Sequence, residues 1–221
     1  MKKPDSKGYK GIGMEGFIAR SYDKTARRMH VYREWADRLA QQIHDGAHVL
    51  EIAPGPGYLA IELARRKDCR IVGLEISTTF IGIARRNAQE AGVEIDFRQG
   101  NASAMPFEDG TFDFIVCTSS FKNFSQPFMA LREIRRVLKT NGRAWVSDLR
   151  RDVSDRTIRD FVANEMNMEG FPAFFMRYTF KHQLRPRAYL SEQWKEMAEK
   201  TRFTRVEIKN NPMDFEALLE K

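Results

Sequence analysis

The sequence is poor in cysteine and has no long apolar run. Its two cysteines, Cys69 and Cys117, lack the paired spacing of a zinc site or a redox motif. The residues after Met1 are polar or glycine-rich, which excludes an apolar signal peptide here, and no stretch is long enough to cross a bilayer. We therefore expect a cytoplasmic protein with two free thiols, no metal site and no membrane span.

Charge of neither sign is scarce. The chain has 37 Lys and Arg against 30 Asp and Glu, and 42% of its residues are hydrophobic. This composition is that of an ordinary globular domain and excludes a disordered chain. The net charge of +7 eases the approach of an anionic substrate, a nucleic acid or an acidic lipid surface. The net charge alone does not assign a function.

Strand and helix patterns alternate through most of the chain. Residues 1–13 have little to bury, which predicts a mobile tail before a single domain at 14–221. Apolar residues recur on one helix face from Thr25 to Ile43, within a group of N-terminal cap helices at 14–45. Expected strands then lie at 48–52, 70–74, 94–98, 111–117, 142–148 and 203–209, and helices at 58–66, 79–91, 128–138 and 191–201. The alternation predicts an α/β fold, with a doubly wound, mostly parallel sheet between two layers of helices.

The alternation breaks after residue 150. Residues 152–168 have a helical pattern, and 170–186 are rich in Phe, Met and Arg. We expect an insertion at 151–190 after the fifth strand, which follows a core at 46–150. The segment 191–221 then completes the fold with a helix and strands.

The most informative segment follows the first expected strand. Gly55 and Gly57 permit a tight turn and a close approach of the backbone to a ligand, and the next helix offers unpaired N–H groups. Residues 55–60 also fit the glycine fingerprint of NAD-binding folds, whose third glycine can be alanine. The glycines alone do not choose between cofactors.

Glu51 discriminates between them, because its carboxylate would repel a dinucleotide pyrophosphate at close range. S-adenosylmethionine (SAM) has no phosphate, but it has an ammonium and a sulfonium group. An acidic residue at the end of this strand therefore favours SAM. Glu75 ends the second expected strand, where a carboxylate can accept hydrogen bonds from ribose hydroxyls.

The loop resembles the first motif of the class I SAM-dependent methyltransferases, an acidic residue followed by alternating glycines. Glu51, Gly55 and Gly57 match it. Ala53 stands where the family usually has glycine, and we expect the turn not to need a positive φ there. The resemblance implies the class I methyltransferase fold, SAM as cofactor and S-adenosylhomocysteine as product.

Other segments extend the resemblance. It implies that Ile76 packs on adenine, that Asn101 and Ala102 contact the adenine amino group, and that Thr118 lies beside the methionine part of SAM. Residues 22–27 resemble a motif of type 11 methyltransferases of ubiquinone and menaquinone biosynthesis, in which a tyrosine, here Tyr22, closes over the cofactor.

The insertion indicates the acceptor. Its aromatic residues and basic residues would form an apolar wall with cationic edges, and in the resembling fold this stretch is a lid over the active site. We expect a small apolar or aromatic acceptor, with basic groups available for an acidic one. The expected substrate contacts are Phe121, Phe174, Tyr178 and His182.

Three readings stay open at this point. After small-molecule methyl transfer come RNA or protein methylation, which the basic charge permits, and an NAD(P)-dependent oxidoreductase, which Glu51 opposes. Residues 121–124 lack the motif of many enzymes that methylate base or glutamine nitrogens. The sequence assigns no catalytic residue; His30, His182, Tyr178 and Lys122 are the candidates for a general base. The oligomeric state is not predicted.

Overall fold

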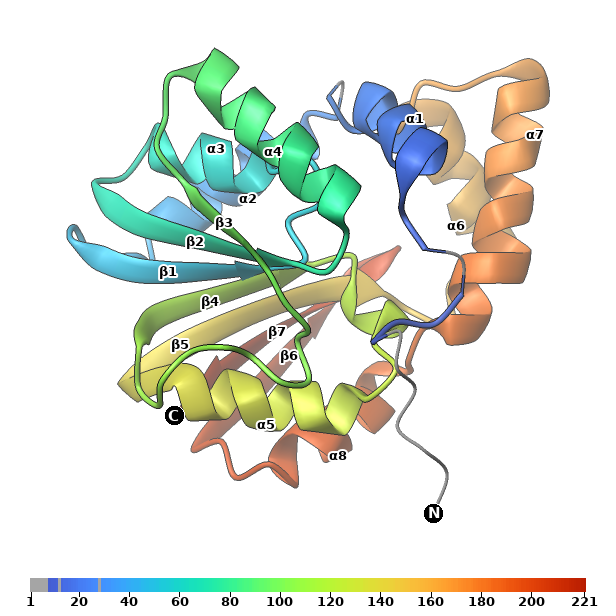
Figure 1. Ribbon diagram of the computed structural model, residues 1–221. Coiled ribbons are helices and arrows are strands. Elements are labelled where there is room, and N and C mark those ends of the chain that lie inside the picture. Colours follow the sequence, from blue (N-terminus) through green and yellow to red (C-terminus); the bar gives the residue numbers. More distant parts are fainter. Residues whose placement is uncertain (1–7, 12, 28) are drawn as a thin grey trace.

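The protein is built on one mixed β-sheet. The computed structural model describes residues 8–11, 13–27 and 29–221, and in this part of the chain seven strands follow the order β3-β2-β1-β4-β5-β7-β6 (Figure 1). β7 runs antiparallel to both its neighbours, and the other pairs are parallel. The predicted doubly wound, mostly parallel α/β fold is thereby confirmed. The strands are β1 (Ala47–Ile52), β2 (Cys69–Glu75), β3 (Asp96–Gln99), β4 (Phe112–Thr118), β5 (Leu138–Leu149), β6 (Arg205–Asn210) and β7 (Asp214–Glu220).

Helices cover both faces of this sheet because the central strands are apolar on both sides. Val49 of β1 belongs to the core under α2 (Val31–Ala40), α3 (Tyr58–Ala64) and α4 (Thr78–Ala91). Its neighbour Leu50 belongs to the opposite core, under α5 (Pro127–Val137) and α8 (Ser191–Glu199). Successive side chains of a strand point to opposite faces, so a buried parallel strand needs apolar residues in succession.

The tryptophans are divided between these two cores. Trp35 and Trp145 lie on the α2 side with their ring centroids 6.0 Å apart. Trp194 of α8 is buried in the other core, where its ring lies 5.4 Å from those of Phe121 and Phe215. Each layer of the fold therefore has its own buried indole.

A helix near the N-terminus and the segment that follows β5 form a third region, beside the sheet in Figure 1. It comprises α1 (Gly16–Ala26), α6 (Asp155–Asp160), η2 (Phe161–Glu165), α7 (Gly170–Thr179), η3 (Phe180–Leu184) and η4 (Arg185–Arg187). The inserted segment has a small core of its own, which includes Ile158, Val162 and Ala173. A short helix η1 (Phe121–Asn123) follows β4.

Three expectations from the sequence need correction. The single helix expected at Thr25–Ile43 is two helices, because α1 buries Ala19 against α4 while α2 buries Trp35 over the sheet. A single straight helix could not pack against α4 and over the sheet at the same time. The helix expected at 152–168 is α6 followed by a wider turn, η2. The strand expected at 94–98 is β3, which begins two residues later and ends one residue later.

A further correction concerns the expected tail, of which residues 1–7 and 12 lie outside the described residues. Residues 8–11 do not extend away from the domain. Tyr9 forms an isolated bridge with Phe124, and the Lys10 N–H donates to the Asn123 carbonyl. The Lys10 side chain donates to the Tyr189 hydroxyl at 3.0 Å. The segment thus joins the turn after β4 to the insertion.

Candidate functional site

The strand order reverses between β1 and β4, which are hydrogen-bonded neighbours although β2 and β3 lie between them in sequence. Loops leaving the carboxyl ends of strands at such a reversal diverge, and the crevice between them is the usual ligand site of open α/β sheets. The turn after β1 lies at this point, next to those after β2 and β4. Most of the cofactor-binding residues predicted from the sequence lie in these three turns or at the ends of the strands that precede them.

The turn after β1 is built from left-handed backbone conformations. Gly55 has φ 56° and Gly57 has φ 83°, and a Cβ on Gly57 would lie 2.9 Å from the Phe97 ring. Glycine is therefore required at position 57 on two grounds. Ala53 also has a positive φ, of 55°. Our expectation that Ala53 needs no positive φ is wrong, because this backbone is left-handed from its first residue, where alanine is strained.

Glu75 joins the turn after β1 to the turn after β2. One of its carboxylate oxygens accepts from the Gly55 N–H at 3.0 Å and the other from the Ser77 N–H at 2.9 Å. Burial raises the pKa of Glu75, and these two N–H donors oppose the rise. A carboxylate oxygen has a second lone pair, so Glu75 can still accept from a ligand hydroxyl.

Glu51 is the most perturbed acid in this region. Burial raises its pKa to about 8; the backbone N–H of Ala60 favours the ionised form, and the nearby Glu75 charge disfavours it. One Glu51 oxygen, Oε2, is buried with no hydrogen-bond partner among the described residues. An orphaned buried acceptor of this kind costs about 1–3 kcal/mol. It is therefore suited to a ligand that brings a donor or a positive charge.

A polar network that sequence reasoning missed fixes α1 to the glycine turn. The buried Asp23 of α1 accepts from the Tyr58 hydroxyl at 2.7 Å and from the Asn87 side chain at 3.2 Å. Asn87 also donates to the Pro56 carbonyl at 2.9 Å, and Arg27 donates to Tyr58 and to Asn87. An available signal was Asn87, a polar residue on the apolar face of a helix. Tyr22, on the same helix α1, packs edge-on against Phe80 of α4.

The turn after β3 brings Asn101 to the same edge as Glu75. The Gly100 N–H donates to the Glu75 carbonyl, the Asn101 side chain accepts from the Ser103 N–H, and Ala102 is buried. The backbone of Gly8 packs on this turn, since a Cβ on Gly8 would lie 2.7 Å from both Asn101 Nδ2 and Ile76 Cδ1. Any ring bound between Ile76 and Asn101 therefore contacts or displaces residues 8–11.

The turn after β4 is held by a buried ion pair. Thr118 ends the strand, and the Lys122 ammonium lies 2.8 Å from an Asp148 oxygen while it also donates to the Ser119 carbonyl. The Lys122 N–H donates to the other Asp148 oxygen at 2.5 Å. Ser119 has a positive φ of 53°. The Lys122 side chain is buried and its nitrogen is engaged by Asp148 and Ser119, so Lys122 does not suit the role of a general base.

The expected substrate contacts do not come together. Phe121 is fully buried between Phe124, Tyr189 and Trp194, which makes it a core residue and not a substrate contact. Phe174 and Tyr178 are exposed on α7, and the Tyr178 ring packs against His182 with centroids 4.5 Å apart. The sequence could not show that Phe121 is buried while Phe174 and Tyr178 are exposed. It does not tell which aromatic residues pack in a core, or which face of α7 meets the insertion core. His30 is also exposed.

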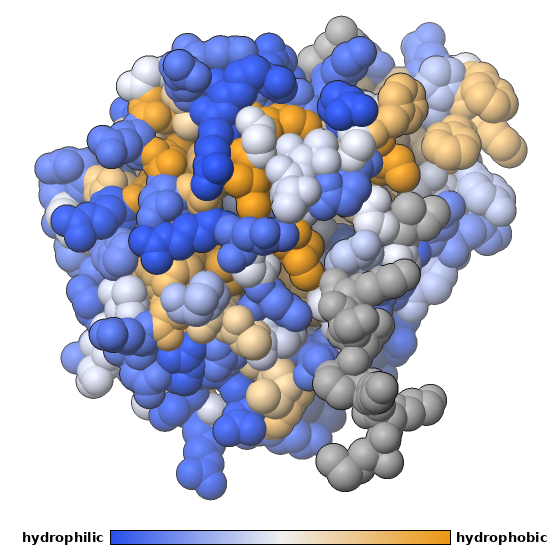
Figure 2. All heavy atoms as spheres, in the orientation of Figure 1, coloured by the Kyte–Doolittle hydropathy of each residue, from blue (hydrophilic) through white to orange (hydrophobic). Residues whose placement is uncertain are grey.

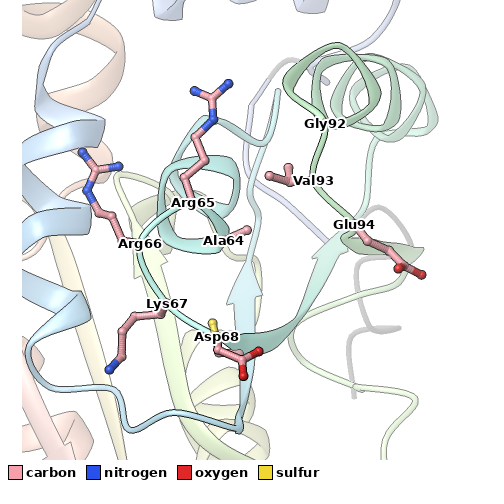
Figure 3. A pocket seen from close by; sticks show the side chains of 9 residues that line it. Ala64, Arg65, Arg66, Lys67, Asp68, Gly92, Val93 and Glu94 are labelled. Atoms are coloured by element: carbon pink, nitrogen blue, oxygen red, sulfur yellow. The ribbon is translucent and has the colours of Figure 1, made fainter.

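A surface hollow of about 450 Å³ lies elsewhere, between the α3–β2 and α4–β3 turns (Figure 3). It is at the amino ends of β2 and β3, opposite to the turns described above. Its cations are already neutralised: Arg66 pairs with Asp37 and Glu62, and Lys67 pairs with Asp45. The hollow therefore offers no ready anion site. In the part of the chain that the structure describes, no three His, Cys, Asp or Glu side chains are grouped to hold a metal ion.

The residues at the switch point fit SAM. The unpartnered Glu51 oxygen suits the ammonium and Glu75 suits the ribose, and the left-handed glycines of the turn let its backbone approach a ligand closely. Burial raises the pKa of both acidic side chains at the ends of β1 and β2, so this environment disfavours negative charge, and a pyrophosphate would bring more of it. The acidic side chains at this site thus disfavour a dinucleotide, as the sequence also indicates.

Comparison with known proteins agrees with this geometry. Residues 50–146 match the methyltransferase domain family of type 11. The chain is 38% identical over 99 residues to a demethylmenaquinone methyltransferase of Thermus thermophilus, covering 44% of this chain and 45% of that one. It is 32% identical over 139 residues to the protein of that name from Lactiplantibacillus plantarum, covering 59% of each. A Methanococcus maripaludis structure described as a SAM-dependent methyltransferase superposes with a TM-score of 0.76 at 21% identity, covering 96% and 95%.

The matches with the curated relatives are partial. The chain spans about half the length of those it matches first, with 45%, 59% and 54% covered. The family match, at residues 50–146, includes the β1 turn with Glu51 and the turns after β2 and β4. The sheet order and these likenesses show that the chain has the fold of SAM-dependent methyltransferases, and that its residues 50–146 match a methyltransferase domain of type 11.

Proposed function

We propose that this protein transfers a methyl group from SAM to a small molecule. The observation that carries the proposal is the buried, unpartnered oxygen of Glu51, which lies at the turn that the type 11 family shares. Glu51 would accept from the SAM ammonium and Glu75 from the ribose hydroxyls. Gly55 and Gly57 would bring the backbone close to the methionine part, and Ala53 and the end of β4 at Thr118 would complete that side.

The adenine would lie between the turns after β2 and β3. We propose that Ile76 packs on its face and that Asn101 and the Ala102 backbone recognise its amino group. Tyr22 would cover the cofactor from α1, which the Asp23 network holds on the glycine turn. Residues 151–190 would serve as the lid.

SAM supplies a methyl group activated by the positive charge on sulfur. The bond from methyl to sulfur breaks as the bond to the acceptor forms, and an acceptor O–H, N–H or C–H releases a proton. Because charge is lost at the transition state, alignment and exclusion of water supply much of the acceleration. The chain's part is therefore to orient the two molecules, and none of its side chains is assigned as the base.

The names of the relatives support an aromatic acceptor. Two of the curated relatives above are named demethylmenaquinone methyltransferases, and we propose a quinone-type small molecule for this chain as well. The aromatic residues of α1 and α7 suit an apolar ring, and the basic residues after α7 suit an acidic substituent. RNA or protein methylation is the second candidate, supported by the net charge of +7.

A thermal-shift experiment tests the cofactor. S-adenosylhomocysteine should raise Tm by about 5–10 °C at a hundredfold excess over its Kd, whereas NAD and NADP should not. Glu51→Gln should reduce the shift because it removes the carboxylate that faces the ammonium, while exposed Glu94→Gln should not. Stabilisation by NAD alone would overturn the proposal.

Turnover tests the acceptor. With methyl-labelled SAM, a reduced naphthoquinone should gain one methyl in the mass spectrum, while transfer RNA and protein substrates should stay unlabelled. Labelled RNA would instead favour the second candidate. Binding of S-adenosylhomocysteine without turnover on any acceptor would indicate a SAM-binding module without this activity.

A further inference from the structure

The inserted helix α7 exposes an aromatic stripe. Phe171, Phe174, Phe175 and Tyr178 are 77%, 59%, 57% and 49% exposed. Their spacing of i, i+3, i+4 and i+7 places them on one face of the helix. The residue of α7 that is buried in the insertion core is Ala173, on the other face. The stripe therefore does not hold the insertion together.

Helix α1 exposes apolar side chains as well. Phe17, Ile18 and Tyr22 are 78%, 43% and 39% exposed. Figure 2 shows hydrophobic atoms at the corner of the molecule where Figure 1 places α1 and α7. Large exposed apolar side chains from two elements at one corner are unusual on a monomer and mark a contact surface.

The segment that begins with α7 is basic, although the acidic Glu165 and Glu169 come directly before it. Residues 170–190 contain Arg177, Lys181, Arg185 and Arg187 and no acidic residue. The four basic residues follow the exposed phenylalanines in sequence, so apolar and cationic groups form successive bands along the segment. Lys181 and Arg185 share a single counter-ion, Asp155. An exposed aromatic helix face accompanied by basic residues is typical of a helix that lies at a membrane surface, with its aromatic side chains among the lipids and its charges at the anionic headgroups.

We propose that the exposed faces of α7 and α1 dock on an anionic lipid bilayer. The described helices contain no segment long and apolar enough to span a membrane, so the contact is peripheral and reversible. Docking would bring α1, which the Asp23 network holds on the glycine turn, to the lipid surface, and an apolar acceptor could then pass from the lipid to this turn without crossing water. The docking surface does not depend on the proposed function. Only the route of the acceptor rests on the proposed function.

Vesicle co-sedimentation tests the surface, with vesicles of phosphatidylcholine alone and of phosphatidylcholine mixed with phosphatidylglycerol. The protein should pellet with the anionic vesicles, and less so as salt increases. Phe174→Ser/Phe175→Ser should lower the partition coefficient about tenfold or more, since two large apolar side chains are lost from the lipid contact. Arg177→Gln should lower binding to the anionic vesicles without changing the weak binding to neutral ones.

The chain offers a matched control. Phe128 and Met129 are a second exposed apolar pair, 39% and 37% exposed, at the start of α5, away from α7. Phe128→Ser/Met129→Ser should therefore leave vesicle binding unchanged. The S-adenosylhomocysteine thermal shift of both double variants should equal that of the parent protein, which shows that each is folded.

Four outcomes would overturn the proposal. The first is failure of the protein to bind anionic vesicles, and the second is an equal loss of vesicle binding in both double variants. The third is a dimer in sedimentation velocity that only Phe174→Ser/Phe175→Ser dissociates. The fourth is a protein that does not bind vesicles but retards single-stranded RNA in a gel, with a retardation that depends on Phe174 and Phe175. A protein that docks on vesicles but fails to bind S-adenosylhomocysteine would retain this surface and lose the proposed function. The two proposals therefore fail separately.

Discussion

At the scale of single residues, the protonation of Glu51 should make stability depend on pH. Its pKa is about 8 in the folded protein against an ordinary value of 4.5. Between these values the carboxyl is neutral when folded and ionised when unfolded, so the unfolded state binds fewer protons. The free energy of unfolding should therefore fall as pH rises from about 4.5 to about 8, by at most about 5 kcal/mol, and level off above.

Glu51→Gln isolates this effect because the amide is neutral throughout. Urea unfolding at pH 5.5 and pH 8.5 should show the variant gaining stability relative to the parent at the higher pH. Glu94→Gln is the control, since Glu94 is exposed. Equal slopes of stability against pH in the parent and in Glu51→Gln would show that Glu51 titrates normally.

Ala53 is the second residue with a local consequence. Its φ of 55° is in the left-handed region, where a Cβ costs about 1–2 kcal/mol. Ala53→Gly relieves this strain but gives the unfolded chain about 0.4–1 kcal/mol more conformational freedom. We expect a net stabilisation of about 0.5 kcal/mol by chemical denaturation.

The matched comparison is Ala60→Gly in α3, where glycine removes a buried methyl from a helix. That change should destabilise by about 1 kcal/mol or more. If Ala53→Gly destabilised to the same degree, the turn would not be left-handed at residue 53.

At the scale of elements, the docking of α1 on the glycine turn depends on Tyr58. Its hydroxyl donates to Asp23 and accepts from Arg27. Tyr58→Phe removes both bonds, at a cost of about 1–3 kcal/mol. The loss should appear mainly as opening of α1, measured as faster amide hydrogen exchange in residues 16–26.

Tyr189→Phe is the control for this experiment, because it also deletes a hydroxyl, one that accepts from Lys10. It should leave exchange in α1 unchanged. Unaltered exchange in α1 of Tyr58→Phe would mean that apolar packing, such as Ala19 against Phe80, docks the helix without the network.

The connection between β4 and β5 depends on the Lys122–Asp148 pair. Both side chains are at most 5% exposed. Lys122→Met leaves the Asp148 carboxylate buried without its cation, which should cost about 3–5 kcal/mol. In a double-mutant cycle measured by chemical denaturation, Lys122→Met/Asp148→Leu should recover a large part of this loss. Additive losses in the double variant would contradict a coupled pair.

At the scale of the whole molecule, the sequence predicts the sheet well because its central strands are apolar on both faces and its turns contain glycine and acidic residues. Glu51, Gly55 and Glu75 could be placed together since parallel strands bring their carboxyl ends to one edge. The direction of a side chain in the insertion could not be predicted. Phe121 and Phe174 are both aromatic, and only packing makes one a core residue and leaves the other exposed.

Long-range polar contacts were also beyond the sequence. The partners Asp23, Tyr58 and Asn87 lie up to 64 residues apart, and no periodicity links them. The conformation of Ala53 was predicted wrongly for a different reason. An alanine suggests a negative φ, but contacts elsewhere in the fold can impose a positive one. Here the hydrogen bond from the Ala53 N–H to the Leu74 carbonyl fixes the turn beside β2.

The division of the tryptophans between the two layers has a practical consequence for spectroscopy. Trp35 and Trp145 on one face of the sheet and Trp194 on the other are all buried, so the emission of the native protein should lie towards the blue. With Trp194→Phe the remaining emission would come only from the α2 side, and with Trp35→Phe/Trp145→Phe only from the α8 side. A pair of such variants would show by fluorescence alone whether the two layers melt together.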